Sequence, residues 1–282
     1  DDNLPSCKQV AAPGYPMISS HTFRGLWAYR GFVLGSVKRE FQSKYSNAIL
    51  GAAWSLLSPL AMILVYTVIF AEVMRSKLPG SDNTFAYSIY LCAGILTWGL
   101  FAEIVARAQG MFIDQANLIK KISFPRISLP LIVVLNALLN FGIIFGLFTV
   151  FLVASGNFPG LAYLAIFPVL VLQVMFAIGL GMIIGVLNVF FRDVGQFFTI
   201  FIQFWFWFTP IVYPASILPE GVRGALAWNP MAQIIGAYQS ILVNGAMPDW
   251  RSLVPALVMA VLMCVFALRL FRKRAGEMVD EL

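Results

Sequence analysis

The chain has 282 residues, of which 60% are hydrophobic and 11% are charged, and its mean hydropathy is +0.83. Soluble domains carry about 25% charged residues, so this composition excludes an ordinary soluble domain and indicates a polytopic membrane protein. The net charge of +6 does not indicate nucleic-acid binding, because the cations lie in the gaps between apolar runs, where they set topology.

The segment before the first apolar run divides into two parts. Residues 1–22 contain no continuous apolar stretch, so we expect a flexible segment without a signal peptide and insertion directed by the first span. Apolar residues then recur at three-to-four spacing over 23–46, which predicts an amphipathic helix, within a unit 23–47, in the cytoplasmic membrane interface. The alternative is a partly solvated arm packed on protein. The apolar positions are Phe23, Leu26, Trp27, Val33, Leu34, Val37 and Phe41.

Six uncharged or nearly uncharged runs follow, and we consider each long enough to span, since a helix needs roughly 20 residues to cross about 30 Å of hydrocarbon. The sequence therefore predicts an all-α membrane protein with a six-helix transmembrane domain over 48–271 and a cytoplasmic tail over 272–282. We place the spans at about 48–71, 88–109, 127–153, 163–190, 196–213 and 252–271.

Lysines and arginines between these spans predict the orientation. Thirteen fall on one side of the membrane under the six-span topology, and four fall on the other. Because Lys and Arg favour the cytoplasmic side, we expect both termini in the cytoplasm. The four outer cations are Arg75, Lys77, Arg223 and Arg251.

The second span carries two charges, Glu103 and Arg107, whose i,i+4 order favours an ion pair. Charges at membrane depth are costly and usually face protein or water. The pair is therefore either structural or part of a gate or transmission element.

The connection after the second span reads DQANLIKKISFPRISLP over 114–130. Asp114 is expected to cap a short helix that ends at Lys121, with cations toward its C-terminal end as the helix dipole prefers. An apolar knuckle between cations suits docking into a partner's cleft, and the alternative is a turn that carries positive charge for topology. The knuckle consists of Leu118, Ile119 and Ile122 beside Lys120 and Lys121.

The fourth span and the turn after it carry two local signals. Gly181 and Gly185 have GxxxG spacing, which predicts close helix packing rather than a hinge. Arg192 and Asp193 form a tight cytoplasmic turn before the fifth span. That turn either only reverses the chain or takes part in coupling.

The fifth span is unusually aromatic, because eight of the first twelve residues of FFTIFIQFWFWFTP (197–210) are rings. Such stripes more often pack in a core, against lipid or against a second copy than line a site, and both interpretations stay open at this point. The rings on one helical stripe are Phe197, Phe201, Phe204, Trp205 and Phe208. Phe198, Phe206 and Trp207 lie off the stripe and are assigned to packing or the lipid interface.

The connection over 214–251 is the longest, and it is apolar although it should face outward. Four prolines, Pro214, Pro219, Pro230 and Pro248, make it too broken for one span. We predict one or two short re-entrant helices, which are tolerated where they pack on protein or line a cavity. The alternative is an ordinary surface loop.

No residue pattern indicates catalysis or metal binding. The sequence contains no GxxxxGK(S/T) phosphate-binding loop, no paired carboxylates and no metal-ligand spacing. The single histidine, His21, lies in a polar segment and is expected to be solvated or capping.

Five motifs in fixed order resemble the permease subunits of bacterial ABC polysaccharide exporters. The Wzm-type O-antigen permeases are the nearest, with teichoic-acid and capsule exporters as relatives, and the resemblance covers about 30–282. The motifs are SVKREFQSKYSNAILGAAWSLLSPL (36–60), NLIKKISFP (117–125), FFRDV (190–194), TPIVYP (209–214) and WNP (228–230).

The resemblance implies a homodimer of permeases that assembles with two separate Wzt-type ATP-binding subunits. ATP and Mg would be bound by those subunits, and this chain would be a transport subunit without a cofactor rather than an enzyme. The complex would move a lipid-linked polysaccharide across the bacterial inner membrane. The interface helix and the 114–125 segment would contact the ATPase through Asn117, Leu118, Ile119, Lys120, Lys121, Phe124 and Pro125.

With this resemblance, the aromatic stripe becomes a candidate substrate channel, and Trp54 on the first span becomes a companion ring. Aromatic faces offer weak, repeated contacts to the C–H faces of sugars. Two other classes stay open: an exporter of a small hydrophobic compound on the same architecture, and a channel or secondary transporter without an ATPase.

Overall fold

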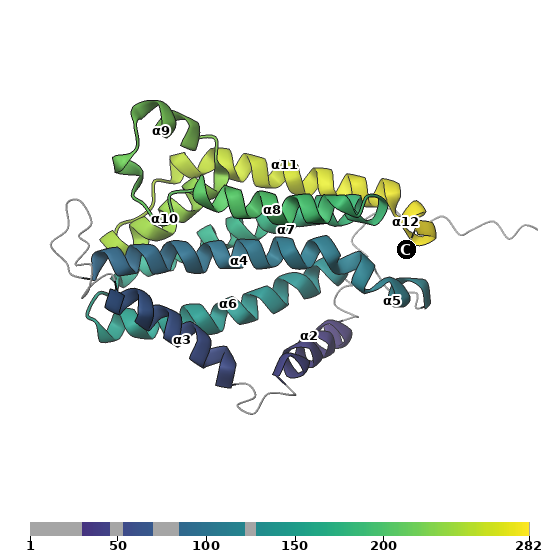
Figure 1. The fold of residues 1–282 in the computed structure, drawn as a ribbon, viewed down its shortest axis with the longest axis horizontal. Helices are drawn as coiled ribbons and strands as arrows, with labels where there is room; N and C mark the ends of the chain where they lie inside the picture. The colour runs from purple at the N-terminus through teal and green to yellow at the C-terminus, as the bar shows by residue number, and fades with distance from the viewer. Residues whose placement is uncertain (1–29, 46–52, 70–84, 122–127, 282) are drawn as a thin grey trace, which may run out of the picture.

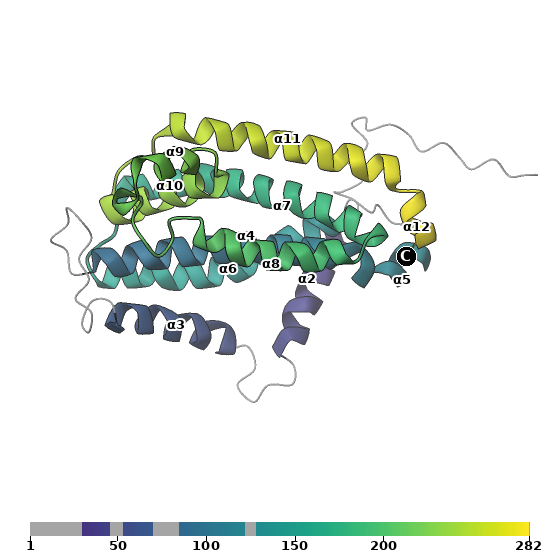
Figure 2. The same ribbon diagram turned by 45° about the horizontal axis from the view of Figure 1, so that its top comes forward.

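The computed structural model describes residues 30–45, 53–69, 85–121 and 128–281, and every regular element in these ranges is a helix (Figure 1). The longer helices run side by side as one bundle (Figures 1 and 2). The α-helices are α2 (Arg30–Tyr45), α3 (Trp54–Thr67), α4 (Ala86–Asp114), α5 (Ala116–Lys121), α6 (Ser128–Ala154), α7 (Ile166–Phe190), α8 (Asp193–Trp207), α9 (Glu220–Leu226), α10 (Pro230–Asn244), α11 (Trp250–Arg274) and α12 (Glu277–Glu281). Two 3-10 helices, η3 (Gly160–Ala165) and η4 (Ala215–Ile217), complete the set.

Four helical segments are long and apolar enough to cross a membrane: α4, α6, η3 with α7, and α11. They coincide with the predicted second, third, fourth and sixth spans, which confirms an all-helical polytopic membrane protein. The first and fifth predicted spans hold shorter helices, because α3 has 14 residues and α8 has 15. A total of six spans therefore remains a prediction.

Helices α4 and α7 form the centre of the bundle, with α11 on one side and α6 and α3 on the other (Figure 2). Their close approach needs glycine. A Cβ atom at Gly181 would lie 2.6 Å from Cβ of Ala108, and one at Gly185 would collide with the backbone oxygen of Ala108. The predicted GxxxG packing is thus confirmed, and its partner is α4.

Helix α8 ends at Trp207, six residues before the predicted end of the fifth span. Pro210 cannot supply a backbone N–H and disfavours helix at the preceding residue. Side chains satisfy the irregular backbone that follows α8, because the carbonyl of Pro210 accepts from Tyr90 Oη at 3.0 Å and from Gln239 Nε2 at 3.3 Å. The carbonyl of Val212 accepts from the hydroxyl of Tyr87 at 2.7 Å. Irregular backbone is tolerated inside an apolar bundle where protein satisfies its polar groups.

The connection after α8 contains helices rather than a plain loop, as predicted. Helix α10 is capped at its start by the amide of Asn229, has Pro230 in its first turn and is followed by Gly245, whose φ of 61° lies in the left-handed region. One face of α10 is buried against α4, α7 and α11, and Tyr238 on it is fully buried. The structure therefore shows a packed helix here, and its placement relative to a membrane remains a prediction.

Helix α2 coincides with the predicted interface helix from residue 30 onward, whereas residues 23–29 lie outside the described part of the chain. Val33 and Val37 are buried, and α2 packs on α6, while Leu34 is 62% exposed. One apolar edge of α2 is therefore held by protein, and another remains open for lipid or a partner.

The short helix after α4 begins later than predicted. Asp114 does not cap it, because α4 continues through Asp114 and α5 begins at Ala116. Met111 and Phe112, near the end of α4, are buried in the core. This packing keeps the last turn of α4 helical, so α4 includes Asp114, the expected cap.

Candidate functional site

Five polar side chains from α2, α4 and α6 meet in one cluster, which we call the polar junction. Arg107 donates from Nε and Nη2 to Oε1 of Glu103, at 2.9 and 2.8 Å, and from Nη1 to Oε1 of Glu40. The remaining oxygen of Glu103 accepts from Asn140 Nδ2 at 2.8 Å, and that of Glu40 accepts from Asn136 Nδ2. Each oxygen of the two carboxylates therefore has a partner. The guanidinium joins α4 to α2, and the two amides join α6 to the same carboxylates.

The predicted pairing of Glu103 with Arg107 is confirmed, but the rest of the polar junction was not predicted. Asn136 and Asn140 lie one turn apart in an otherwise apolar span, and this polar pair was the available signal. Nothing in the sequence indicated that Glu40, sixty-three residues before Glu103 and on a separate helix, would complete the cluster.

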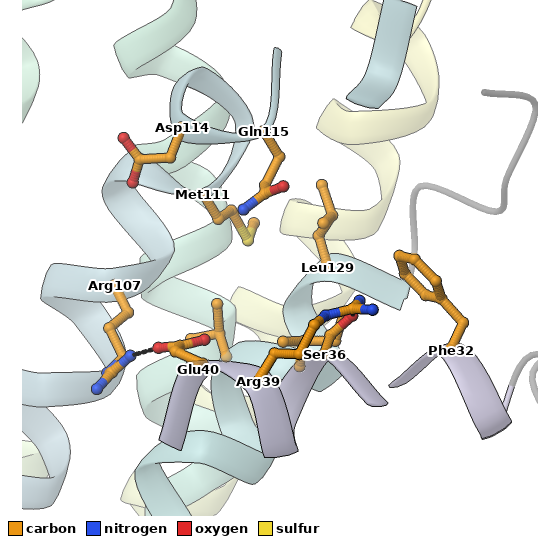
Figure 3. Close-up of a pocket in the computed structure, with 11 residues that line it drawn as sticks. Phe32, Ser36, Arg39, Glu40, Arg107, Met111, Asp114, Gln115 and Leu129 are labelled. Carbon is orange, nitrogen blue, oxygen red and sulfur yellow. Dashed lines mark hydrogen bonds and ion pairs between the residues drawn. The ribbon is translucent and has the colours of Figure 1, made fainter. Parts of the chain in front are cut away.

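A pocket of about 490 Å³ lies beside the polar junction, between α2, α4 and α6. Figure 3 shows the Glu40–Arg107 ion pair at one edge of this pocket and Phe32 at the opposite edge. Its charged lining residues are Arg39, Glu40, Arg107 and Asp114. Because both signs are present in equal number, this wall does not select for an anion or a cation.

A second pocket, of about 450 Å³, opens along α8 and the connection that follows it, and we call it the aromatic groove. Four of the five predicted stripe residues line it. The fifth, Phe197, stacks on Phe201 with ring centroids 6.1 Å apart and planes at 16°, so the stripe continues beyond the groove. The groove is lined by Phe201, Phe204, Trp205, Phe208, Tyr213, Leu218, Leu226, Trp228, Asn229 and Pro230.

The rings of the stripe are not equivalent. Phe197, Phe201, Phe204 and Phe208 are 42–71% exposed, whereas Trp205 is partly buried. Off the stripe, Phe206 packs edge-on against Trp98, with centroids 5.7 Å apart. The aromatic residues of α8 thus lie on two faces of the helix. One face is exposed, and the other packs against α4.

The other predicted site residues lie apart from the aromatic groove. Trp54 is the first residue of α3, is 49% exposed and is not among the groove-lining residues. Arg192 and Asp193 are exposed and join α7 to α8 in the predicted tight turn.

The predicted coupling segment is described only in part. Ile119 is 7% exposed and belongs to the core, so it anchors α5 to the bundle and does not present itself for docking. Asn117 is exposed. Phe124 and Pro125 lie outside the described residues, as do the side chains of Leu118, Lys120 and Lys121.

The sequence matches the ABC-2 type transporter family over residues 33–243, a stretch that includes the polar junction and the whole aromatic groove. The chain belongs to this family of membrane transport permeases. The expected resemblance is therefore confirmed over most of its predicted extent, and α11 and α12 lie beyond the family match.

Several relatives of this ABC-2 permease are named as polysaccharide export or transport proteins. It is 32% identical over 262 residues to an O-antigen export system permease of Myxococcus xanthus, covering 92% of this chain and 98% of the relative. It is 30% identical to an O-antigen export system permease of Klebsiella pneumoniae, covering 83% and 88%. A polysialic acid transport protein of Escherichia coli is 20% identical over 86% of this chain and 92% of its own length.

Proposed function

We propose that this ABC-2 permease exports a lipid-linked polysaccharide of the O-antigen type across the bacterial inner membrane. The aromatic groove carries the proposal, because it gathers four exposed or partly exposed rings along one helix face and continues through Phe197. A pyranose has C–H groups on its faces, and aromatic faces offer these groups apolar area and a negative quadrupole. Many weak contacts of this kind allow a polymer to bind and still move on.

The exposed rings of α8 favour a conduit between two copies of the chain. Phe204 and Phe208 are 62% and 71% exposed, and Trp54 on α3 is also open. In a homodimer, the α8 faces of the two copies enclose the polymer, and α3 with Trp54 completes the wall. The 214–251 connection, which contains α9 and α10, gates the outer exit of this conduit.

The energy comes from two separate ATP-binding subunits of the Wzt type, which hold ATP and Mg. They dock on the cytoplasmic side, where both termini and the 272–282 tail lie, against the interface helix of 23–47 and the 114–125 segment. Asn117, Leu118, Lys120, Lys121, Phe124 and Pro125 make the contact, and buried Ile119 holds the segment to the bundle.

The polar junction transmits this movement. Arg107 bonds to Glu103 on its own helix and to Glu40 on α2, so a displacement of α2 reaches α4 through directional bonds. A displacement of α5 reaches α4 along the chain, because α5 follows α4 directly. Arg192 and Asp193 stand at the start of α8 and carry the displacement into the aromatic stripe. Glu103 and Arg107 are thus transmission residues rather than a substrate site.

A triple substitution tests the conduit. Phe201→Ala, Trp205→Ala and Phe208→Ala together should lower surface polysaccharide roughly tenfold or more, because each lost ring contact removes about 0.5–1.5 kcal/mol of binding. The matched control replaces one exposed off-stripe tryptophan and two exposed phenylalanines elsewhere, Trp207, Phe167 and Phe266. Undiminished surface polysaccharide in an assembled triple mutant would refute the conduit.

Capsule-type export is the second candidate, favoured by the similarity to the polysialic acid transport protein. That similarity is lower than to the O-antigen permeases. Deleting the gene and identifying the polymer that disappears from the cell surface, or accumulates inside, distinguishes the two.

A further inference from the structure

Trp205 of the aromatic groove also packs against aromatic rings inside the protein. Its ring meets Phe101 at 5.4 Å, Trp98 at 6.2 Å and Phe176 at 6.2 Å between centroids, all edge-on. On its other side it meets Phe201 of the exposed stripe, at 5.5 Å. Trp205 therefore joins the rings of the core to those of the groove, and its orientation sets the shape of the groove wall.

A single amide side chain holds the polar edge of this ring. Trp205 Nε1 donates to Oδ1 of Asn229 at 3.1 Å, and a partly buried indole N–H needs such a partner. Nδ2 of Asn229 donates to Thr209 Oγ1 at 3.1 Å and to the carbonyl of Phe208 at 3.4 Å. The indole is only a donor and the carbonyl is only an acceptor, so their positions fix which way the amide faces.

The same amide also begins α10. Oδ1 of Asn229 accepts from the backbone N–H groups of Met231 and Ala232, at 3.1 and 3.3 Å. Thr209 in turn donates to the carbonyl of Trp205 at 2.9 Å, which closes a ring of hydrogen bonds through Trp205, Asn229 and Thr209. The last turn of α8 and the first turn of α10 are thus fixed to each other through one side chain.

We propose that Asn229 is a positioning residue that sets the ring of Trp205 in the wall of the aromatic groove. This proposal rests on the proposed function, in which the groove carries a glycan. Because the amide of Asn229 and the N–H of Trp205 are already engaged, neither offers a hydrogen bond to a sugar. This part of the groove recognises the C–H faces of pyranoses, which differ little among sugars, rather than the pattern of hydroxyl groups.

The substitution Asn229→Ser separates the two roles of the amide. Asn229→Ser keeps a side-chain oxygen that can cap α10, but its shorter side chain cannot reach Trp205. The measurement is the NMR spectrum of the indole N–H groups in ¹⁵N-tryptophan-labelled full-length protein in nanodiscs. The protein has seven tryptophans, and the one indole signal that disappears in Trp205→Phe belongs to Trp205. We expect Asn229→Ser to move that signal, and Asn244→Ser, at the exposed far end of α10, to leave it unmoved. Thr209→Val, which removes the acceptor for Nδ2, should move the signal by less and serves if Asn229→Ser does not fold.

A double-mutant cycle on export completes the test. Asn229→Ser and Trp205→Phe should each lower export by roughly two- to tenfold, the range expected for one hydrogen bond. The double mutant should be no worse than the more affected single mutant, because both remove the same bond. An unmoved indole signal, or effects that multiply in the double mutant, would overturn the positioning role. A moved signal with normal export in every variant would support that role and overturn the glycan conduit instead.

Discussion

The polar junction and the aromatic groove both join helices that are distant in sequence, but they use opposite chemistry. In the polar junction, one guanidinium and two amides satisfy two carboxylates through directional hydrogen bonds. Along the aromatic groove and stripe, rings meet at centroid distances of 5.5 and 6.1 Å with different plane angles, and the indole N–H of Trp205 is bonded to Asn229. Directional bonds allow few arrangements and suit the transfer of a movement. Ring surfaces allow many arrangements and suit a sliding polymer.

The largest expected effect comes from removing the centre of the polar junction. Arg107→Met leaves two carboxylates without their shared cation, and their side chains are only 21% and 44% exposed. We expect a loss of about 3 kcal/mol in the free energy of unfolding, at the lower end of values for broken buried pairs, because water partly screens the charges. Thermal unfolding of the purified permease measures the loss.

The control for Arg107→Met is Arg269→Met, which removes an exposed arginine from α11. It should change the unfolding temperature little. If both variants unfold alike, the polar junction contributes no more than surface charge, and the contrast between the two regions fails.

A smaller effect is expected at the edge of the same cluster. Asn140→Leu removes the donor to Oε2 of Glu103 and should cost about 1.5 kcal/mol, the lower end of the range for a hydrogen bond to a charged group, because Glu103 keeps Arg107. Leu139→Ala, at a neighbouring position that is 48% exposed, is the control on α6. In the Arg107→Met background, Asn140→Leu should cost a different amount, because the two side chains bind one carboxylate. Simple additivity would show that they act separately.

The sequence was most informative where one helix contains the whole signal. The i,i+4 order of Glu103 and Arg107 and the GxxxG spacing of Gly181 and Gly185 depend only on helical geometry, and both predictions are confirmed. The aromatic stripe is also periodic within one helix, so its shared face could be recognised before its surroundings were known.

The sequence was least informative where distant segments meet. The irregular backbone after α8 depends on hydroxyl groups of Tyr87 and Tyr90, more than a hundred residues earlier, which donate to its carbonyls. The partner of Arg107 on α2 likewise required the fold. The motif WNP marked Asn229 as part of a family pattern, but its hydrogen bonds to both α8 and α10 became visible only in three dimensions.

The smallest effect, and the one that separates the two chemistries most sharply, is expected from a single ring of the aromatic groove. Phe204→Leu keeps apolar area but removes the aromatic face, so export should fall by about threefold or less while the unfolding temperature stays unchanged. The control is Phe167→Leu, a similarly exposed ring outside the groove.

Export is measured in proteoliposomes at low and high salt. The deficit of Phe204→Leu should be the same at both, because contacts to rings are not screened, whereas that of Arg107→Met should depend on salt. A salt-dependent deficit at Phe204 would mean that the groove acts through charges after all.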